Sequence, residues 1–416
     1  MNTSAAHSSF TRSTSARAQA VGWLSKHNVC IVTLAGVALC AIHGAAKADA
    51  LDTPAFTGPL APNPDPTSVD GGPLGPVYLT AQLTAIGLVQ SHAVPAPGTG
   101  NGGSLGDLSN AQVQLQTTEG LVQFYLQGGA YSLPSLGSTY LRAEKAPDEL
   151  FGVLPIAYAT LAPTPEISFQ VGALPTLIGA EYTFTFQNMN IERGLLWNQE
   201  PAVSKGMQLN FTRGPITAAV SYNDGFYSDH YNWISGLLAY ELNDSNAISI
   251  VGGGNFSSTA QSSFVAPLAQ NNSSLYNIIY TYSSDKFTVS PYVQYTHVKE
   301  DTAIGIDRGA HTLGGAVLGS YNVTEEFAVA ARAEYVKASG GGCGTDVDCE
   351  PTVLLYGPDS SAWSLTVTPS YQKGVFFARA EVSFVRISSL TAGFGFGDNL
   401  DHRDQVRGLI ETGVLF

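Results

Sequence analysis

Some charged residues in this chain form pairs that are spaced two residues apart. Arg332 precedes Glu334, and Arg379 precedes Glu381, each within a run of small and apolar residues. Successive side chains of a β-strand point to opposite faces, so residues two apart share a face. If these runs are strands, each places an arginine beside a glutamate. Such pairs could brace a wall by ion pairing or set the charge of a water-filled passage.

Further charges lie in one long irregular stretch and near the chain's end. Residues 172–206 are too long for a tight turn, and long ordered connections tend to be functional. We expect this stretch to fold into an enclosed lumen and to narrow it around residues 175–203; an exposed loop is the alternative. The residues predicted to line or constrict the pore are Glu181, Glu192, Arg193, Arg332, Glu334, Arg379, Glu381 and Glu411.

No recognisable catalytic machinery accompanies these charges. The HExxH zinc motif and the phosphate-binding GxxxxGK[ST] loop are both missing from the sequence. Asp229-His230 is the most suggestive pair, and a polar turn in an outer loop is its simpler explanation. We therefore expect neither an enzyme nor a cofactor. Because triads can be assembled from distant residues, a hydrolase stays an alternative.

The first 50 residues are typical of an export signal. Residues 1–28 contain three Lys and Arg residues and no acidic one, and residues 29–42 form an apolar run. This run is too short to cross a bilayer as a helix, which needs ~20 residues. Followed by AAKADA, it predicts a secretory signal peptide cleaved near Ala50. An organelle transit peptide is the alternative, because the basic region is long and Ser-rich.

The exported chain would be acidic. Cleavage after residue 50 removes four of the 19 Lys and Arg residues and one of the 33 acidic residues, which leaves 15 against 32 and a net charge of −17. Nucleic-acid binding needs clustered Lys and Arg, so we expect no such partner. A water-filled cavity in this protein would carry a negative potential and prefer cations mildly.

Two cysteines remain in the exported chain, Cys343 and Cys349. In an oxidising compartment two nearby cysteines are expected to form a disulfide. With no histidine beside them they do not complete a tetrahedral zinc site, and we expect no metal. Asp346, Asp348 and Glu350 lack the full ligand order of an EF-hand, so a solvated acidic loop is favoured over a calcium site.

The body of the chain alternates apolar and polar residues in short segments. Only 12% of residues are charged, against ~25% in soluble domains, and no second long apolar run exists. NAQVQLQT, for example, alternates small or apolar residues with polar ones. This pattern is typical of a transmembrane antiparallel β-barrel with apolar residues facing lipid. A soluble sandwich with one wet face shows the same alternation.

We expect an all-β barrel of about sixteen strands, within a range of roughly 12 to 18, over residues 77–416. An even count puts both chain ends on the periplasmic side, and about sixteen strands leave an aqueous channel. Residues 51–76 are rich in Pro and Gly and should form a flexible periplasmic lead without strands. The expected strands are 77–90, 110–117, 121–131, 154–162, 166–174, 203–212, 216–224, 233–242, 246–255, 274–283, 287–298, 309–319, 326–337, 361–371, 375–386 and 407–416.

Residues 166–226 resemble a known family. VGALPTLIGAE is followed by an Asn-rich run, an Arg-Gly step and SKGMQLNFTRGPITAAVSYNDG. This order resembles the OmpL-like β-barrel porin family of Gram-negative bacteria, with Ala173 where that family usually has Lys. The resemblance implies an outer-membrane barrel that passes small hydrophilic solutes or ions by diffusion. The matching positions are Gly172, Pro175, Thr176, Gly179 and Glu181.

The chain ends on an aromatic residue, Phe416, with Val414 two positions before it. This ending resembles the signal read by the outer-membrane assembly machinery. The expected partners are therefore that machinery, the lipid bilayer and small hydrophilic solutes, and porins of this size often form homotrimers. Two alternatives to a porin stay open: a closed structural or adhesive barrel, and a barrel hydrolase.

Overall fold

The computed structural model describes residues 46–47, 51–94, 102–257, 263 and 265–416. Contacts divide the chain after Ala46 into two units, and residues 47–416 form the larger one. The predicted signal peptide, residues 1–50, lies outside the described residues except for β1 (Ala46–Lys47). No helix among the described residues is long and apolar enough to cross a bilayer.

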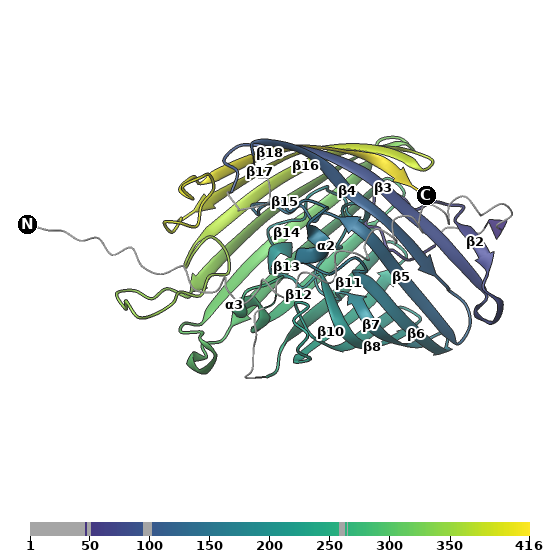
Figure 1. Cartoon of the computed structure of the whole chain (residues 1–416), viewed down its shortest axis with the longest axis horizontal. Helices are drawn as coiled ribbons and strands as arrows, with labels where there is room; N and C mark the ends of the chain where they lie inside the picture. The colour runs from purple at the N-terminus through teal and green to yellow at the C-terminus, as the bar shows by residue number, and fades with distance from the viewer. Residues whose placement is uncertain (1–45, 48–50, 95–101, 258–262, 264) are drawn as a thin grey trace, which may run out of the picture. The chain divides into compact units, whose positions relative to one another are not determined.

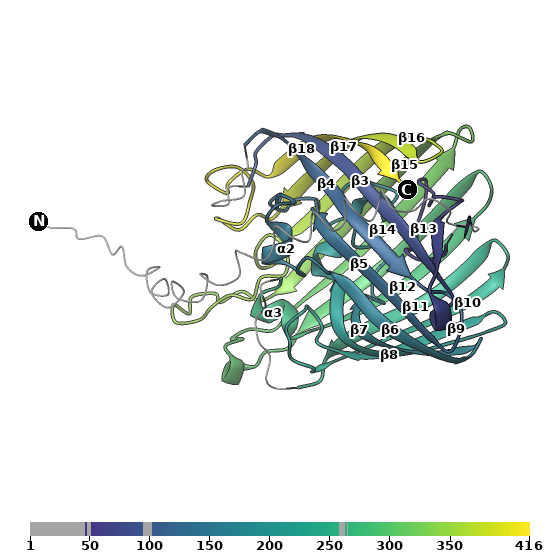
Figure 2. The same ribbon diagram turned by 45° about the vertical axis from the view of Figure 1, so that its right-hand side comes forward.

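Sixteen antiparallel strands form one closed barrel, which confirms the predicted fold and strand number (Figure 1). Each strand pairs with its neighbour along the chain, and the last returns to the first, with Thr412 opposite Ala85. Figure 2 shows this seam from a second side. Closure leaves no unpaired sheet edge in lipid. The strands are β3 (Pro76–Gln90), β4 (Ser104–Gln116), β5 (Val122–Tyr131), β6 (Ile156–Thr164), β7 (Ile167–Pro175), β8 (Val203–Arg213), β9 (Ile216–Asn223), β10 (Trp233–Asn243), β11 (Asn246–Asn255), β12 (Ser273–Ser283), β13 (Phe287–Val298), β14 (Ala310–Asn322), β15 (Phe327–Gly340), β16 (Ser361–Lys373), β17 (Phe376–Ser388) and β18 (Asp404–Leu415).

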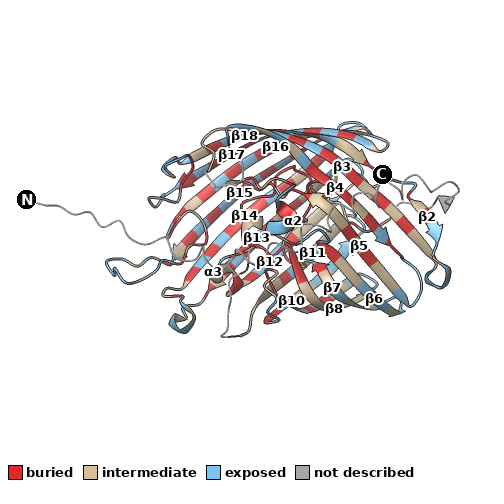
Figure 3. Ribbon diagram, in the orientation of Figure 1, coloured by how far each residue is buried: buried red, intermediate tan, exposed pale blue. Residues whose placement is uncertain are grey.

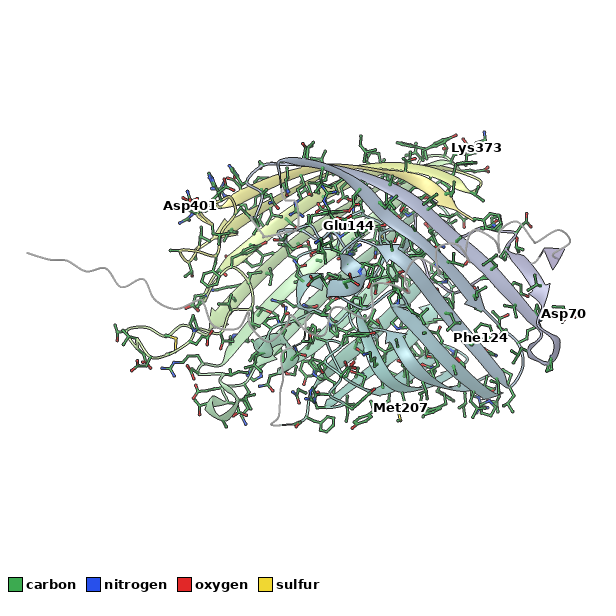
Figure 4. All side chains as sticks on the ribbon, in the orientation of Figure 1. Asp70, Phe124, Glu144, Met207, Lys373 and Asp401 are labelled. Carbon is green, nitrogen blue, oxygen red and sulfur yellow. A yellow bond between two sulfur atoms is a disulfide. The ribbon has the colours of Figure 1, made fainter. Side chains whose placement is uncertain are left out.

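The alternation of residue types becomes an alternation of burial along each strand (Figure 3). On β15, Arg332 and Glu334 are buried, whereas Ala333 between them and Tyr335 after them are exposed. Met207 on β8 is 45% exposed and lies on the outer surface (Figure 4). An apolar outer face around a polar interior is the arrangement that a barrel in lipid requires.

The two ends of the barrel differ in their connections. At one end, seven turns of two to five residues join the strands: 117–121, 165–166, 214–215, 244–245, 284–286, 323–326 and 374–375. Outer-membrane barrels have short periplasmic turns and longer extracellular loops, so we expect this end to be periplasmic. Figure 4 marks it by Lys373 and marks the long-loop end by Asp401. The C-terminus lies at the short-turn end (Figure 1).

Residues 51–76, the lead segment, differ from the prediction of a flexible, strandless lead. β2 (Thr67–Asp70) pairs with the start of β3, and η1 (Gly72–Leu74) connects the two. The side chain of Gln372 exchanges two hydrogen bonds of 2.8 and 3.0 Å with the backbone of Ala61. These pairings give the backbone groups of a Pro-rich segment partners that its composition does not predict.

The apolar core lies inside the lumen. Residues 176–202, the inner segment, connect β7 to β8 and contain η2 (Thr185–Gln187) and η3 (Trp197–Gln199). Leu195 and Leu196 of this segment are fully buried in one cluster with residues of β11–β15. The remaining short helices lie in other long loops: α2 (Ala146–Glu149), α3 (Leu268–Asn271) and η4 (Thr302–Ile304).

Candidate functional site

Arg332 on β15 joins the inner segment to the barrel wall. Its Nη1 lies 2.6 Å from Oε1 of Glu181 and also donates to the carbonyl oxygen of Glu192 at 2.7 Å. Its Nε lies 3.3 Å from Oε2 of Glu334 on the same strand. All four residues are at most 5% exposed. Buried charges are tolerated when paired in this way, and removal of one partner is strongly destabilising.

Two wall glutamates accept hydrogen bonds from the backbone of the inner segment. Glu334 accepts from the N–H groups of Leu195 and Leu196 at 3.0 and 3.3 Å. Glu381 on β17 accepts from those of residues 191 and 192 at 2.5 and 3.1 Å. Without these carboxylates the N–H groups would be buried with no partner, which is costly.

Strand β16 lies between β15 and β17 and links their glutamates. Ser364 donates its hydroxyl to Glu334, and Thr368 donates its hydroxyl to Glu381, each at 2.7 Å. Asn190 of the inner segment in turn donates to Thr368 at 2.7 Å. The charges of β15 and β17 therefore belong to one hydrogen-bonded group, the charged band, which runs from strand to strand along the inner face of the wall.

Arg379 and Arg407 extend the charged band across β17 and β18. Arg379 contacts Glu411 and donates to the carbonyl oxygens of Thr185 and Asn188 at 3.0 and 2.9 Å. Nη1 of Arg407 lies 2.6 Å from Oε1 of Glu192. Arg407 is not among the predicted site residues. It shares the inward face of its strand with Glu411, and that spacing is the signal that could have identified it.

The eight predicted pore residues are all brought together, but none faces open water. Each is at most 5% exposed, because carboxylates and guanidinium groups inside the lumen bind the inner segment. Their role in lining or constricting a pore stays a prediction; in the structure they hold the inner segment inside the lumen. Arg193 differs from the others, since its guanidinium carbon lies 5.1 Å from the ring centre of Trp197.

Gly179 shows why the inner segment needs glycine near its start. Its φ is +90°, a conformation that side chains with a Cβ rarely adopt. A Cβ there would also come within 1.8 Å of Oε2 of Glu200. Glu200 is a further buried carboxylate that sequence reasoning missed, at 5% exposure. The positive φ and the close approach of this carboxylate both disfavour a larger residue.

Two adjoining cavities lie beside β4–β8, away from the charged band. The larger measures about 750 Å³ and reaches the periplasmic turns at Thr118 and Pro165. The smaller measures about 290 Å³ and extends to residues 182–184 of the inner segment. Thr53, Tyr125, Tyr158 and Gln170 line both cavities. Sequence reasoning missed this site, although its polar residues follow the inward face of each strand.

The acidic loop and the Asp229-His230 pair lie outside this site. Cys343 and Cys349 form a disulfide, with their Cα atoms 5.7 Å apart. Within that loop Asp346 pairs with Arg308 at 3.0 Å, and among the described residues no group of three metal-ligating side chains occurs. Asp229 pairs with Nζ of Lys205 at 2.5 Å.

The sequence contains one Gly-x-Ser-x-Gly match, residues 102–106, centred on Ser104. In α/β-hydrolases this motif is a sharp turn between a strand and a helix. Here Ser104 is the first residue of β4, and residues 104–116 continue as strand. The match therefore lacks the structural context of a nucleophile.

The C-terminal residue belongs to the seam of the barrel. The backbone N–H and C=O of Phe416 each form a 2.8 Å hydrogen bond with Ala81 of β3. Val414 lies opposite Leu83 on β3 and Phe376 on β17. The Phe416 side chain is 38% exposed. The last residues of the chain thus help to close the sheet.

Comparison with known proteins places the chain among outer-membrane barrels. The family model described as "Putative beta-barrel porin-2, OmpL-like" matches residues 88–416. No curated protein sequence matches this chain.

Solved structures give the same fold at low sequence identity. A loop L8 deletion mutant of OmpT, an outer membrane protein of Vibrio cholerae, has a TM-score of 0.52 and 13% identity, over 82% of this chain and 99% of that one. The outer membrane channel DcaP of Acinetobacter baumannii has a TM-score of 0.53 and 7% identity, over 82% and 97%.

Proposed function

Because the chain belongs to the OmpL-like β-barrel porin-2 family, we propose that this outer-membrane porin passes small hydrophilic solutes along the side of its lumen next to β4–β8. The observation that carries the proposal is the pair of cavities that meet at Tyr125 and Tyr158. They extend from the periplasmic turns to the inner segment; polar groups dominate the lining of the larger cavity, and apolar groups dominate that of the smaller one. Diffusion along such a surface needs neither a cofactor nor proton transfer.

The inner segment is the constriction in this proposal. Its contacts with β15–β18 are buried ion pairs and charge-assisted hydrogen bonds, which are stronger than neutral ones. Its contacts with β11–β15 combine apolar packing with hydrogen bonds that Gln294 donates to Leu196 and that Thr296 and Thr312 donate to Gln199. Phe184 and Phe186 also pack with Tyr125, Tyr131 and Ile156 of β5 and β6 in one buried cluster. A segment fixed on all these sides can restrict the lumen without itself opening and closing, so solute selection would depend on the cavities beside β4–β8.

A mild preference for cations is a further part of the proposal, and the net charge inside the barrel supports it. The charged band and its neighbours contain six glutamates against four arginines, an excess of two negative charges when all are ionised. The residues counted are Glu181, Glu192, Glu200, Glu334, Glu381, Glu411, Arg193, Arg332, Arg379 and Arg407. Because most of these charges are paired and buried, the preference should be small.

The test is reconstitution of the full chain into planar bilayers. Stepwise ion conductance with a small reversal potential of the sign expected for cations would support the proposal. Equal permeability to K⁺ and Cl⁻ would contradict the cation preference but not the proposal that the protein forms a pore. A folded barrel without conductance would contradict the porin and favour a closed structural barrel.

Assembly and oligomeric state are separate parts of the proposal. Phe416 and Val414 would form the signal that the outer-membrane assembly machinery reads. Val414 lies in β18, which closes the barrel, and Phe416 directly follows that strand and pairs with Ala81 of β3. We also propose a homotrimer, because porins of this size often form one. Cross-linking in intact membranes tests it, and a purely monomeric pattern would contradict it.

A further inference from the structure

The larger and smaller cavities together form a vestibule that contains almost no charge. Among the described residues of its lining Asp52 is the one that carries a charge, and it is exposed. The other polar groups are amides, hydroxyls and phenols. Phe124 on β5, labelled in Figure 4, marks the position of the larger cavity, which it lines.

The vestibule wall has a built aromatic surface. The rings of Tyr125 and Tyr158 stack at 5.5 Å between centres, with 20° between their planes. Tyr125 is 4% exposed, and its hydroxyl donates to Oε1 of Gln127 at 2.7 Å. This hydrogen bond and the burial of the ring hold the Tyr125 side chain in place. Tyr158 is half-buried and lines both cavities, so part of its side chain faces the vestibule.

Amide groups surround this surface. Gln170 lines both cavities and accepts a long hydrogen bond of 3.4 Å from Gln208. Gln208 in turn donates to Asn210 at 2.7 Å. A side-chain amide offers both donors and an acceptor, which is the same combination that a solute hydroxyl offers. A solute with many hydroxyl groups can thus replace bound water with equivalent hydrogen bonds.

Charged solutes find no matching partner there. Arg332, Arg379 and Arg407 are each paired with a glutamate of the charged band, and they lie against a different part of the wall. A charged solute that binds to the wall of the vestibule gives up part of its hydration without gaining a counter-charge, which is unfavourable, whereas a hydrated ion can pass without binding. A neutral solute has no such cost, and cavities of about 300–1,000 Å³ suit small organic ligands.

We propose that the vestibule is a binding site for neutral, polyhydroxylated solutes of the saccharide class. The Tyr158 ring would stack on the C–H face of a sugar ring, and Gln170 would hydrogen-bond its hydroxyls. This inference rests on the proposed porin function and specifies its substrate class.

The experiment measures block of ion current by a sugar in planar bilayers that contain the full chain. Maltotriose is the neutral probe, and a trimer of galacturonic acid is the charged probe of similar size. We expect maltotriose to reduce the current with saturation and the uronate trimer to do so much less. Tyr158→Ala should raise the half-blocking concentration roughly tenfold, which corresponds to about 1.4 kcal/mol. Tyr158→Phe, which keeps the ring, should have a smaller effect.

Tyr240→Ala is the matched control, because Tyr240 is 45% exposed on the outer face of β10. It should leave the block unchanged. Calorimetric titration of the folded, detergent-bound protein with maltotriose gives a readout independent of bilayer insertion. Conductance that maltotriose does not block, or that both probes block equally, would overturn this inference but not the porin. Absence of any conductance from folded protein would overturn the porin itself.

Discussion

Glu181 and Arg332 are 151 residues apart in the sequence, yet their side chains meet at 2.6 Å with both fully enclosed. One belongs to the inner segment and the other to β15. This pair therefore fixes a connection between two strands against the wall on another side of the barrel. The ion pair thus holds this long connection inside the lumen.

Arg332→Gln should loosen the inner segment. The substitution leaves Glu181 and Glu334 without their shared cation, and breaking a buried pair costs about 3–5 kcal/mol. We expect unfolding at a lower temperature on heat-modifiability gels and a larger, noisier single-channel current.

Lys373→Gln is the control for this experiment. It breaks an exposed pair with Glu326 at 3.2 Å near the β16–β17 turn, so both readouts should stay unchanged. An Arg332→Gln protein with the gel shift and current of the unmodified chain would show that the inner segment does not depend on this pair.

Most of the barrel could be predicted from alternation alone. Sixteen strands are confirmed, and most boundaries agree within a few residues. The main difference is β4, which begins at Ser104 and not near residue 110. Its register shifts opposite Thr84 and Ala85, so the alternation is interrupted there. A bulge of this kind hides a strand from a strict period of two.

The site could be predicted only in part. Inward-facing charges such as Arg332 and Glu411 follow from strand parity, because residues two apart share a face. Their partners do not follow, since Glu192 meets Arg407 across 215 residues of sequence. The Tyr125–Tyr158 stack likewise depends on the pairing of β5 with β6. Parity tells which side chains enter the lumen, and only the fold tells what they touch.

Replacement of residues 51–58 by a Gly-Ser sequence of equal length should raise the conductance. The Thr57 backbone N–H donates to the carbonyl oxygen of Gln187 at 2.8 Å. The side-chain amide of Gln187 donates to the backbone carbonyl oxygen of Ala55 at 3.1 Å. Thr53 lines both cavities. The lead segment therefore takes up space beside the proposed path. Single-channel recording measures the increase in conductance when this space is no longer occupied.

Gln372→Ala is the control for the lead segment. It removes two hydrogen bonds to Ala61 but leaves residues 51–58 in place, so conductance should not change. If the Gly-Ser replacement also left the current unchanged, the lead segment would have no part in limiting the path.

Phe416→Ser should lower the amount of barrel in the outer membrane several-fold. The Phe416 backbone pairs with Ala81 of β3 at the seam, and its side chain is 38% exposed. Phe376→Ser is the matched control, because Phe376 is 67% exposed on the neighbouring strand and faces the same side. Fractionation of membranes measures both. An equal loss for the two variants would point to lipid contact and not to a terminal signal.

Removal of the disulfide should affect only its loop. Cys343 and Cys349 are six residues apart, and the stabilisation from a cross-link decreases as the closed loop becomes shorter. We expect the double Cys343→Ser, Cys349→Ser variant to keep its conductance and gel shift while proteases cut residues 341–360 faster. A lower unfolding temperature of the whole barrel would contradict this.

The proposed pore is tested most directly by a planar-bilayer recording of the purified, heat-modifiable protein under a KCl gradient. We expect discrete conductance steps and a small reversal potential that indicates a mild preference for K⁺. A correctly folded barrel that carries no current, however much protein is inserted, would contradict the porin function.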